Sequence, residues 1–319
     1  MKIIEDYDLT ERVYGEFQAD VLLGLSKTPK TLSCKWFYDE IGSRLFEEIT
    51  KTAEYYPTRV ETRLLTDVVK HLRDYIPHLD VVIEPGSGAS IKTRLLLESQ
   101  PKLKRYIPID ISEEFLIETA QQLQHDFPSL NIAPLVADFT KPTAELELDA
   151  RLQRMVFFPG STIGNFSPNE AKSLLKSFHT LVGSNAWLLI GVDMTQNKEK
   201  LLAAYNDAAS ITASFNLNLL TRINRELSAN FDIKQFAHQA IFNQAEGRIE
   251  MHLVSKKAQT VSVDNHLFTF EANETIHTEN CYKYTLEAFT NVAGDCGWQI
   301  EHIWQDQQES DYGMLLLTS

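Results

Sequence analysis

A GxG turn follows the apolar segment 81–86 of this 319-residue chain. Gly86 and Gly88 let the backbone turn tightly and let a ligand approach closely, so the turn favours a nucleotide-containing ligand. An ordinary strand-to-helix turn is the alternative. The dinucleotide fingerprint GxGxxG is not met, because Ile91 stands at the third glycine position. The spacing therefore counts against an NAD-dependent oxidoreductase.

Carboxylates end the next two apolar segments. Asp110 lies 22 residues after Gly88, where a carboxylate can accept both ribose hydroxyls of an adenosine-containing ligand. Asp138 and Phe139 offer an acceptor for an exocyclic amine and a ring that can stack on adenine. Asp110 could instead cap the helix that follows it. Ligands in open α/β sheets bind at the carboxyl ends of strands, so these residues are expected to lie together.

A fourth apolar segment ends in the small, polar loop FFPGSTIGNF, residues 157–166. Its Asn165 can orient an amine or a carboxylate without adding a charge. A Gly-Asn turn with positive φ is the alternative interpretation of this position.

The elements that must position these residues alternate along the chain. We predict strands at 81–86, 105–110, 131–139, 155–160 and 187–194, and helices at 91–99, 113–127 and 169–182. Strands separated by helices indicate a parallel sheet with right-handed crossovers, and their unbroken apolar character indicates burial on both faces. The predicted fold class is α/β, a doubly wound sheet.

The flanking segments have other patterns. Helices are predicted at 8–27, 42–50 and from a cap at Thr58 to about residue 75, and mainly helical structure at 205–228. Strands are predicted at 237–242, 248–255, 260–263 and 267–271, then a helix at 285–296 and strands at 298–304 and 312–318. This ending resembles that of a seven-stranded class I methyltransferase sheet. We therefore expect a Rossmann-like methyltransferase domain at 1–194 and 284–319, with an inserted α+β substrate-binding domain at 195–283.

Composition narrows the partners. Lys+Arg 30 against Asp+Glu 44 gives a net charge of −14, which repels polyphosphates and anionic lipids, so neither nucleic acid nor a membrane is an expected partner. Three widely spaced cysteines and nine scattered histidines show no metal-ligand spacing, and no metal is predicted. No export signal or apolar span of about 18–20 residues is present in the sequence, so we expect a cytoplasmic protein, and a monomer is the favoured state.

Several blocks together resemble the histidine-specific methyltransferase family. They are KWFYDEIGSRLFEEIT (35–50), EYYPTR (54–59), EPGSGASIKTR (84–94), STIGNFSP (161–168), the block 205–232, RIEMHL (248–253) and HTENCYKYT (277–285). The resemblance implies a class I fold and an S-adenosylmethionine cofactor. It further implies trimethylation of the α-amine of L-histidine to hercynine, the first step of ergothioneine biosynthesis.

The same resemblance implies the site residues. The cofactor would be held by Tyr38, Gly86, Lys92, Asp110, Asp138 and Phe139. The small-molecule amino-acid substrate would be surrounded by Tyr55, Gly160, Asn165, Tyr205, Met251, Glu279 and Cys281. Catalytic roles would fall to Tyr38, Tyr55 and Asn165, with either tyrosine as a proton acceptor or relay for the amine.

Most of these residues also have a purely structural interpretation. The three tyrosines could be buried with satisfied hydroxyls, Met251 could be a core residue of its strand, and Lys92 could be a solvated helix residue. The family that this chain resembles carries Ser at the position of Cys281. A related aromatic or modified amino acid is therefore an alternative substrate. A methyltransferase-fold binding subunit without turnover is the alternative from another functional class.

Overall fold

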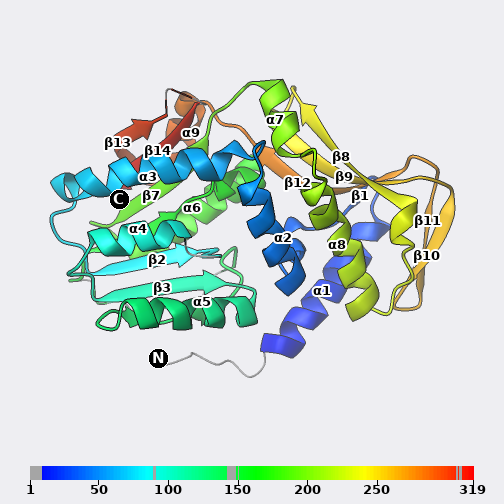
Figure 1. Cartoon of the computed structure of the whole chain (residues 1–319), viewed down its shortest axis with the longest axis horizontal. Coiled ribbons are helices and arrows are strands. Elements are labelled where there is room, and N and C mark those ends of the chain that lie inside the picture. Colours follow the sequence, from blue (N-terminus) through cyan, green and yellow to red (C-terminus); the bar gives the residue numbers. More distant parts are fainter. Residues whose placement is uncertain (1–8, 89–90, 142–148, 150, 307, 309–310) are drawn as a thin grey trace. The chain divides into compact units, whose positions relative to one another are not determined.

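The computed structural model describes residues 9–88, 91–141, 149, 151–306, 308 and 311–319. The described chain divides into two compact units (Figure 1). The first unit contains Tyr56–Gln196 and Lys283–Ser319, and the second contains residues 9–55 and Asn197–Tyr282. Each unit is described separately below.

The first unit is built on a mixed sheet with the order β13-β14-β7-β6-β2-β3-β4, in which β5 also pairs with β3. Its strands are β2 (Val81–Pro85), β3 (Arg105–Asp110), β4 (Asn131–Ile132), β5 (Leu135–Val136), β6 (Arg154–Phe158), β7 (Trp187–Asp193), β13 (Gln299–Gln305) and β14 (Tyr312–Thr318). Pairing from β4 to β7 is parallel, whereas β14 runs antiparallel to both β7 and β13. Strand order therefore reverses at β2, which is where open α/β sheets bind ligands.

Helices connect these strands. They are α3 (Tyr56–Tyr75), α4 (Ile91–Ser99), α5 (Glu113–Asp126), the 3₁₀ turn η2 (Thr162–Asn165), α6 (Pro168–Val182) and α9 (Leu286–Gly294). Helix α3 begins at Tyr56, so the expected cap at Thr58 is wrong. Pro57 stands in the first turn of α3, where its missing N–H and fixed φ are tolerated, and the helix therefore starts before it.

The core of this unit lies on both sides of the central strands. Every residue of β2 and β6 is buried, as the unbroken apolar pattern predicts for a parallel sheet. Each fully buried Val, Ile or Phe side chain contributes about 1.5–3 kcal/mol relative to exposure. The predicted strand 131–139 instead forms two short strands, because Pro134 between β4 and β5 has no N–H to donate to the ladder.

The second unit joins helices to a four-stranded sheet of order β1-β12-β9-β8 and a β10-β11 hairpin. Its elements are α1 (Leu9–Ser26), β1 (Lys30–Thr31), η1 (Cys34–Phe37), α2 (Glu40–Lys51), α7 (Lys198–Ala204), α8 (Ile211–Glu226), η3 (Ile233–Gln235), β8 (Phe236–Asn243), β9 (Arg248–Ser255), β10 (Gln259–Val263), β11 (His266–Phe270) and β12 (Thr275–Tyr282). Strands β8, β9, β10 and β11 were predicted, but β1 and β12 were not.

The N-terminal helices group differently from the sequence expectation. We expected residues 1–194 to belong to the methyltransferase domain, whereas α1 and α2 belong to the second unit. The Asn218 amide of α8 donates to the Asp39 carboxylate at 2.8 Å, and the Arg222 guanidinium donates to the Trp36 carbonyl at 2.9 Å. These contacts, and the packing of α2 on α8, hold the lead-in to the inserted segment.

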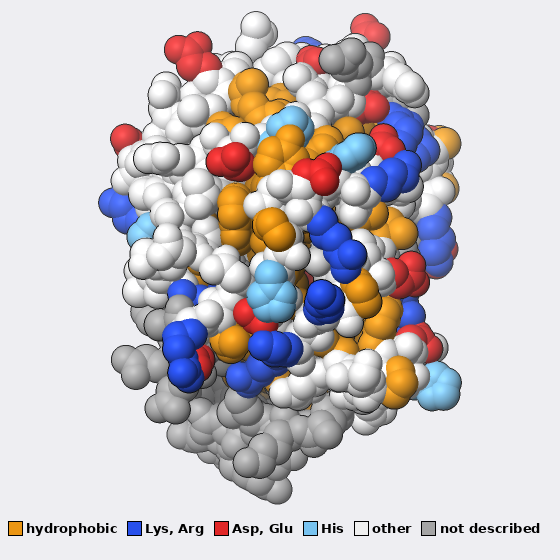
Figure 2. Space-filling model, turned by 90° about the vertical axis from the view of Figure 1, so that its left-hand side faces the viewer, with side chains coloured by type: hydrophobic (Ala, Val, Ile, Leu, Met, Phe, Trp, Pro, Cys, Tyr) orange, Lys and Arg blue, Asp and Glu red, His pale blue; other side chains and the backbone are white. Residues whose placement is uncertain are grey.

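The charges on one face of the molecule and the lengths of its helices are the last features of the fold. On the face in Figure 2, Lys and Arg side chains lie among Asp and Glu side chains, with apolar groups between them. Within the described residues, the helices are all too short or too polar for a membrane span.

Candidate active site

The ends of β2 and β3 meet at the GxG turn. Gly86 has φ +68° and its N–H donates to the Ile109 carbonyl at 2.7 Å, while the Gly88 N–H donates to the Asp110 carboxylate at 3.3 Å. A Cβ on Gly86 would lie 3.3 Å from a ring carbon of Phe139. Three predicted cofactor residues are thus brought together, and glycine is required at this close approach. The next motif residues, 89 and 90, lie outside the described residues.

The Asp110 carboxylate accepts backbone N–H groups from the glycine turn and from the start of α5. One carboxylate oxygen accepts the Gly88 N–H, and the other accepts the Ser112 N–H at 3.0 Å, at the start of α5. Burial raises the pKa of Asp110, although these backbone hydrogen bonds oppose the rise. A carboxylate that is poorly solvated gains from additional donors, and two ribose hydroxyls would supply them.

Asp138 and Phe139 lie in the loop after β5. The Asp138 carboxylate accepts the Thr140 N–H at 3.0 Å and the Thr140 hydroxyl at 2.5 Å. The Phe139 ring lies edge-on to Phe158 and Phe166, with centroids 5.9 and 6.3 Å away. These contacts hold the ring beside Gly86.

Lys92 is not a solvated helix residue. Its ammonium pairs with the Glu61 carboxylate, whose two oxygens accept the Gly160 N–H at 2.7 and 2.8 Å. Tyr312 also donates to Glu61, at 2.8 Å. Glu61 is completely buried and was not predicted as a site residue. Its position on the apolar face of α3, four residues before Leu65, could have indicated a buried acid with a partner.

The loop that carries Asn165 is held by a different turn from the one considered. Positive φ occurs at Gly160 (+85°) and Ser161 (+53°), and Asn165 ends the 3₁₀ turn η2. The Gly-Asn turn is therefore wrong. The Ser161 hydroxyl accepts the Asp193 N–H at 2.9 Å, which ties this loop to the end of β7.

In the second unit, several of the residues predicted to surround the amino-acid substrate gather around Tyr205; Gly160 and Asn165 belong to the first unit. Burial raises the pKa of Tyr205, and the neighbouring Cys281, Tyr55 and Glu279 raise it further. The Tyr205 hydroxyl donates a hydrogen bond to the Cys281 sulfur, and its ring centroid is 6.5 Å from that of Tyr55. The structure thus brings these four residues together, with Met251 paired opposite Glu279 across β9 and β12.

Tyr38 belongs to an aromatic cluster of the second unit. Its ring contacts Phe46 and Phe215 with centroids 5.7 and 5.6 Å away, and Phe46 contacts Tyr55 at 6.1 Å. Tyr38 therefore lies in the same aromatic cluster as Tyr55, whereas the family resemblance implies a cofactor-binding and a catalytic role for it. Phe46 and Phe215 were not singled out, although both fall inside the blocks that carry the family resemblance.

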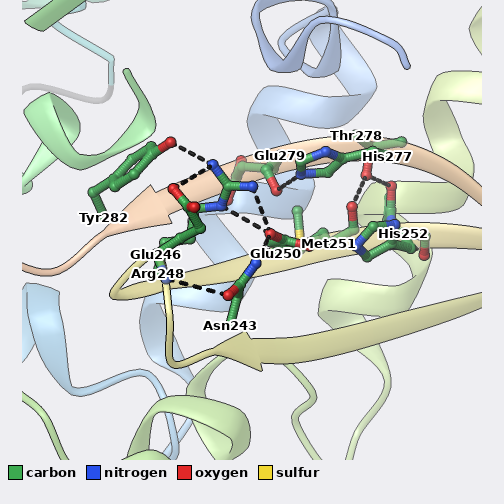
Figure 3. Close-up of polar contacts among 11 residues, drawn as sticks. Asn243, Glu246, Arg248, Glu250, Met251, His252, His277, Thr278, Glu279 and Tyr282 are labelled. Atoms are coloured by element: carbon green, nitrogen blue, oxygen red, sulfur yellow. Dashed lines mark hydrogen bonds and ion pairs between the residues drawn. The ribbon is translucent and has the colours of Figure 1, made fainter. Parts of the chain in front are cut away.

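The opposite face of β9 and β12 carries a polar cluster (Figure 3). Ligand atoms of Glu250, His252 and His277 lie within 4.8 Å of one another. However, the two rings are stacked with centroids 4.7 Å apart and planes 18° apart, so their in-plane lone pairs run side by side and do not converge on one ion. Burial alone would raise the pKa of Glu250, but hydrogen bonds from Asn243, Arg248 and His252 lower it to about 2. This cluster is a hydrogen-bonded support for the two strands.

Comparison with known proteins decides the family. The family model described as "Histidine-specific methyltransferase, SAM-dependent" matches residues 17–319. The chain belongs to this family. It is similar to the histidine N-alpha-methyltransferase of Mycolicibacterium smegmatis, at 37% identity over 98% of both chains. It is also similar to the enzyme of that name from Mycobacterium tuberculosis, at 37% identity over 93% of both.

A solved structure supports the fold. The S-adenosylmethionine-dependent methyltransferase from Clostridium acetobutylicum aligns with a TM-score of 0.51 and 12% identity, covering 86% of this chain and 98% of that one. The class I fold and the S-adenosylmethionine cofactor are therefore confirmed as predicted. The chain is a methyltransferase enzyme, and the NAD-dependent alternative falls away.

Proposed function

We propose that this chain transfers methyl groups from S-adenosylmethionine to the α-amine of L-histidine, forming hercynine in ergothioneine biosynthesis. The observation that carries the proposal is the cluster of Tyr55, Tyr205, Glu279 and Cys281 in the second unit. Similarity to two histidine N-alpha-methyltransferases supports the same substrate. Cys34, Cys281 and Cys296 form no disulfide with one another, which supports a reducing compartment, and we propose that the chain acts in the cytoplasm as a monomer.

The substrate carboxylate is proposed to bind Asn165 and Tyr205. Both side chains are neutral donors once the Tyr205 hydroxyl turns from Cys281 to the substrate, so they would bind a carboxylate without adding a positive charge that would oppose a sulfonium. The raised pKa of Tyr205 keeps its hydroxyl protonated at neutral pH, as a donor must be. Gly160, whose N–H is already held by Glu61, would shape the loop beside Asn165.

The substrate imidazole is proposed to donate to Glu279. This side chain is 9% exposed, so an N–H partner would be recognised in a poorly solvated environment where an unmatched group is costly. Met251, paired across the strands, would supply an adaptable apolar wall. Cys281 lies two residues further along the same strand and would border the ring.

The cofactor is proposed to bind to residues of the first unit. The glycine turn fits a closely approaching ligand, Asp110 would accept the ribose hydroxyls, and Phe139 would stack on the adenine. Asp138 would accept the adenine amine. Bound there, S-adenosylmethionine supplies an electrophilic methyl group. Lys92 would act at this site through its pair with Glu61 and the loop at Gly160.

Methyl transfer requires a neutral amine, because an ammonium has no lone pair. Tyr38 or Tyr55 is proposed to accept or relay the proton, since both belong to the aromatic cluster around the candidate amino-acid residues. No covalent enzyme intermediate is needed, so most of the acceleration would come from holding the amine in line with the methyl group.

Cys281 favours a second candidate substrate. A thiol is a larger and poorer hydrogen-bond donor than the hydroxyl of the resembling family, which weakens a polar contact to imidazole. The same reaction on another aromatic or modified amino acid is therefore the alternative.

Two experiments test the proposal. A screen of the twenty amino acids with mono- and dimethylhistidine, read by mass, identifies the acceptor and the number of methyl groups. Glu279→Ala should then abolish most histidine turnover, while tryptophan turnover changes little, with the exposed Glu271→Ala as the control from the same unit. Histidine kcat/KM that survives Glu279→Ala within about threefold, less than 1 kcal/mol, would exclude imidazole recognition by this carboxylate.

A further inference from the structure

The described chain passes between its two units at three points. These are the bonds between Tyr55 and Tyr56, between residues 196 and 197, and between Tyr282 and Lys283. On the side of the first unit, the chain therefore enters or leaves at Tyr56, Gln196 and Lys283. Residues far apart in sequence reach the same surface region only if the fold gathers them.

One buried carboxylate, that of Asp193, contacts residues at or beside all three crossings. The Tyr56 hydroxyl donates to an Asp193 oxygen at 2.5 Å, and the Lys283 ammonium donates to the same oxygen at 2.7 Å. The other Asp193 oxygen accepts the Thr195 N–H at 3.1 Å, beside the second crossing. Asp193 is 0% exposed and Lys283 is 7% exposed, so the group is shielded from water.

Two further contacts complete the arrangement. The Gln196 side-chain amide donates to the Lys283 carbonyl at 3.4 Å, which joins the second crossing to the third. The Asp193 N–H donates to Ser161, in the loop that leads to Asn165. All of these contacts lie within the first unit.

The protonation states of Asp193 and Tyr56 are set by burial and by their contacts within this group. Burial alone would raise the pKa of Asp193, but the Lys283 ammonium and the hydrogen bonds from Lys283 and Tyr56 lower it overall. Burial raises the pKa of Tyr56, so its hydroxyl stays protonated as a donor. A buried ion pair adds little net stability compared with apolar residues of similar volume, but it imposes one geometry.

We propose that Asp193, Lys283 and Tyr56 form an anchor that positions the amino-acid-binding residues of the proposed active site. The anchor residues are close in sequence to the amino-acid-binding residues. Tyr55 precedes Tyr56, and Glu279 and Cys281 lie four and two residues before Lys283. This inference rests on the proposed function, which identifies the amino-acid substrate that these residues would bind. The three anchor residues are positioning residues, since they act through their neighbours.

Tyr56→Phe is the test, because it removes one hydroxyl and keeps the buried ion pair intact. Tyr75→Phe is the matched control at the other end of α3, about 28 Å away at 1.5 Å per residue, where it removes a hydrogen bond to His302. Tyr56→Phe should raise the KM for histidine or lower kcat/KM by about tenfold, with the Kd for S-adenosylmethionine within about twofold. Tyr75→Phe should leave both unchanged.

Hydrogen exchange gives a readout that is independent of the substrate. In free protein, Tyr56→Phe should speed amide exchange together in segments 54–58, 193–198 and 279–285, whereas Tyr75→Phe should not. Faster exchange confined to 54–58, or unchanged kinetics in folded Tyr56→Phe, would overturn the anchor. Wild-type protein that does not methylate histidine would instead refute the proposed function, and the exchange result would still decide the anchor.

Discussion

Glu84, at the end of β2, should make the stability of the first unit depend on pH. Its carboxylate accepts the Thr93 hydroxyl at 2.7 Å and the Tyr106 hydroxyl at 2.6 Å, and the side chain is buried. Burial raises the pKa of Glu84 from 4.5 to about 7, although these hydrogen bonds oppose the rise. The native state therefore binds a proton that the unfolded chain releases.

The sign and size follow from this difference. Because the folded pKa lies above the unfolded value, the stability from Glu84 is complete below about pH 4.5 and is lost as the pH rises through about 7. A difference of roughly 2.5 pH units at 1.36 kcal/mol each corresponds to about 3 kcal/mol. The loss should level off above pH 8, where Glu84 is ionised in both states.

Glu84→Gln removes this titration while keeping an oxygen acceptor. We expect the free energy of unfolding of the variant, relative to wild type, to rise by about 2.5 kcal/mol between pH 5 and pH 8, because pH 5 already lies above the unfolded pKa. Urea unfolding of both proteins at each pH measures it, and titrations common to both cancel in the comparison. The exposed Glu98→Gln on α4 is the control. A relative stability that is the same at pH 5 and pH 8, within about 0.5 kcal/mol, would refute the reasoning.

Three further predictions concern the ligands. Asp110→Ala should weaken S-adenosylmethionine binding by about 1.5–3 kcal/mol in calorimetry, as expected for hydrogen bonds to a charged group, and an unchanged Kd would remove Asp110 from the site. Asn165→Ala should raise the KM for histidine about tenfold with little change in cofactor affinity, and loss of cofactor binding instead would reassign Asn165. Cys281→Ser should maintain or improve histidine kcat/KM in a steady-state assay, because a hydroxyl forms the shorter hydrogen bond, and a large loss would identify Cys281 as a packing residue.

The sheet of the first unit could be predicted from the sequence because its strands are buried on both faces. Unbroken apolar runs such as β2 and β6 leave a strong pattern, and their polar ends must converge at one edge of the sheet. The contact of Asp110 with Gly88 and the position of Phe139 beside Gly86 follow from that topology.

Other parts left no local pattern. Strand β12 carries Glu279 and Cys281 but is rich in polar residues, since one face meets the candidate substrate residues and the other the His252–Glu250 cluster. The roles of its residues came only from the family resemblance. The assignment of α2 to the second unit depends on contacts with α8 from 179 residues away, which no window of sequence contains.

Two lysines beside the Gly160–Asn165 loop, the half-buried Lys92 and the buried Lys283, illustrate how the charges of such a site are balanced. Lys92 pairs with Glu61, which holds Gly160, and Lys283 pairs with Asp193, which holds Ser161. A bare ammonium about 4 Å from a sulfonium would oppose it by about 4 kcal/mol at an effective dielectric constant of 20. Each lysine is therefore paired with a carboxylate. The Glu61 carboxylate also accepts the Gly160 N–H, whereas Asp193 donates to the Ser161 hydroxyl through its backbone N–H. Under the proposed function, neutral donors would then bind the substrate carboxylate, and the neutral amine would face the methyl group of the sulfonium.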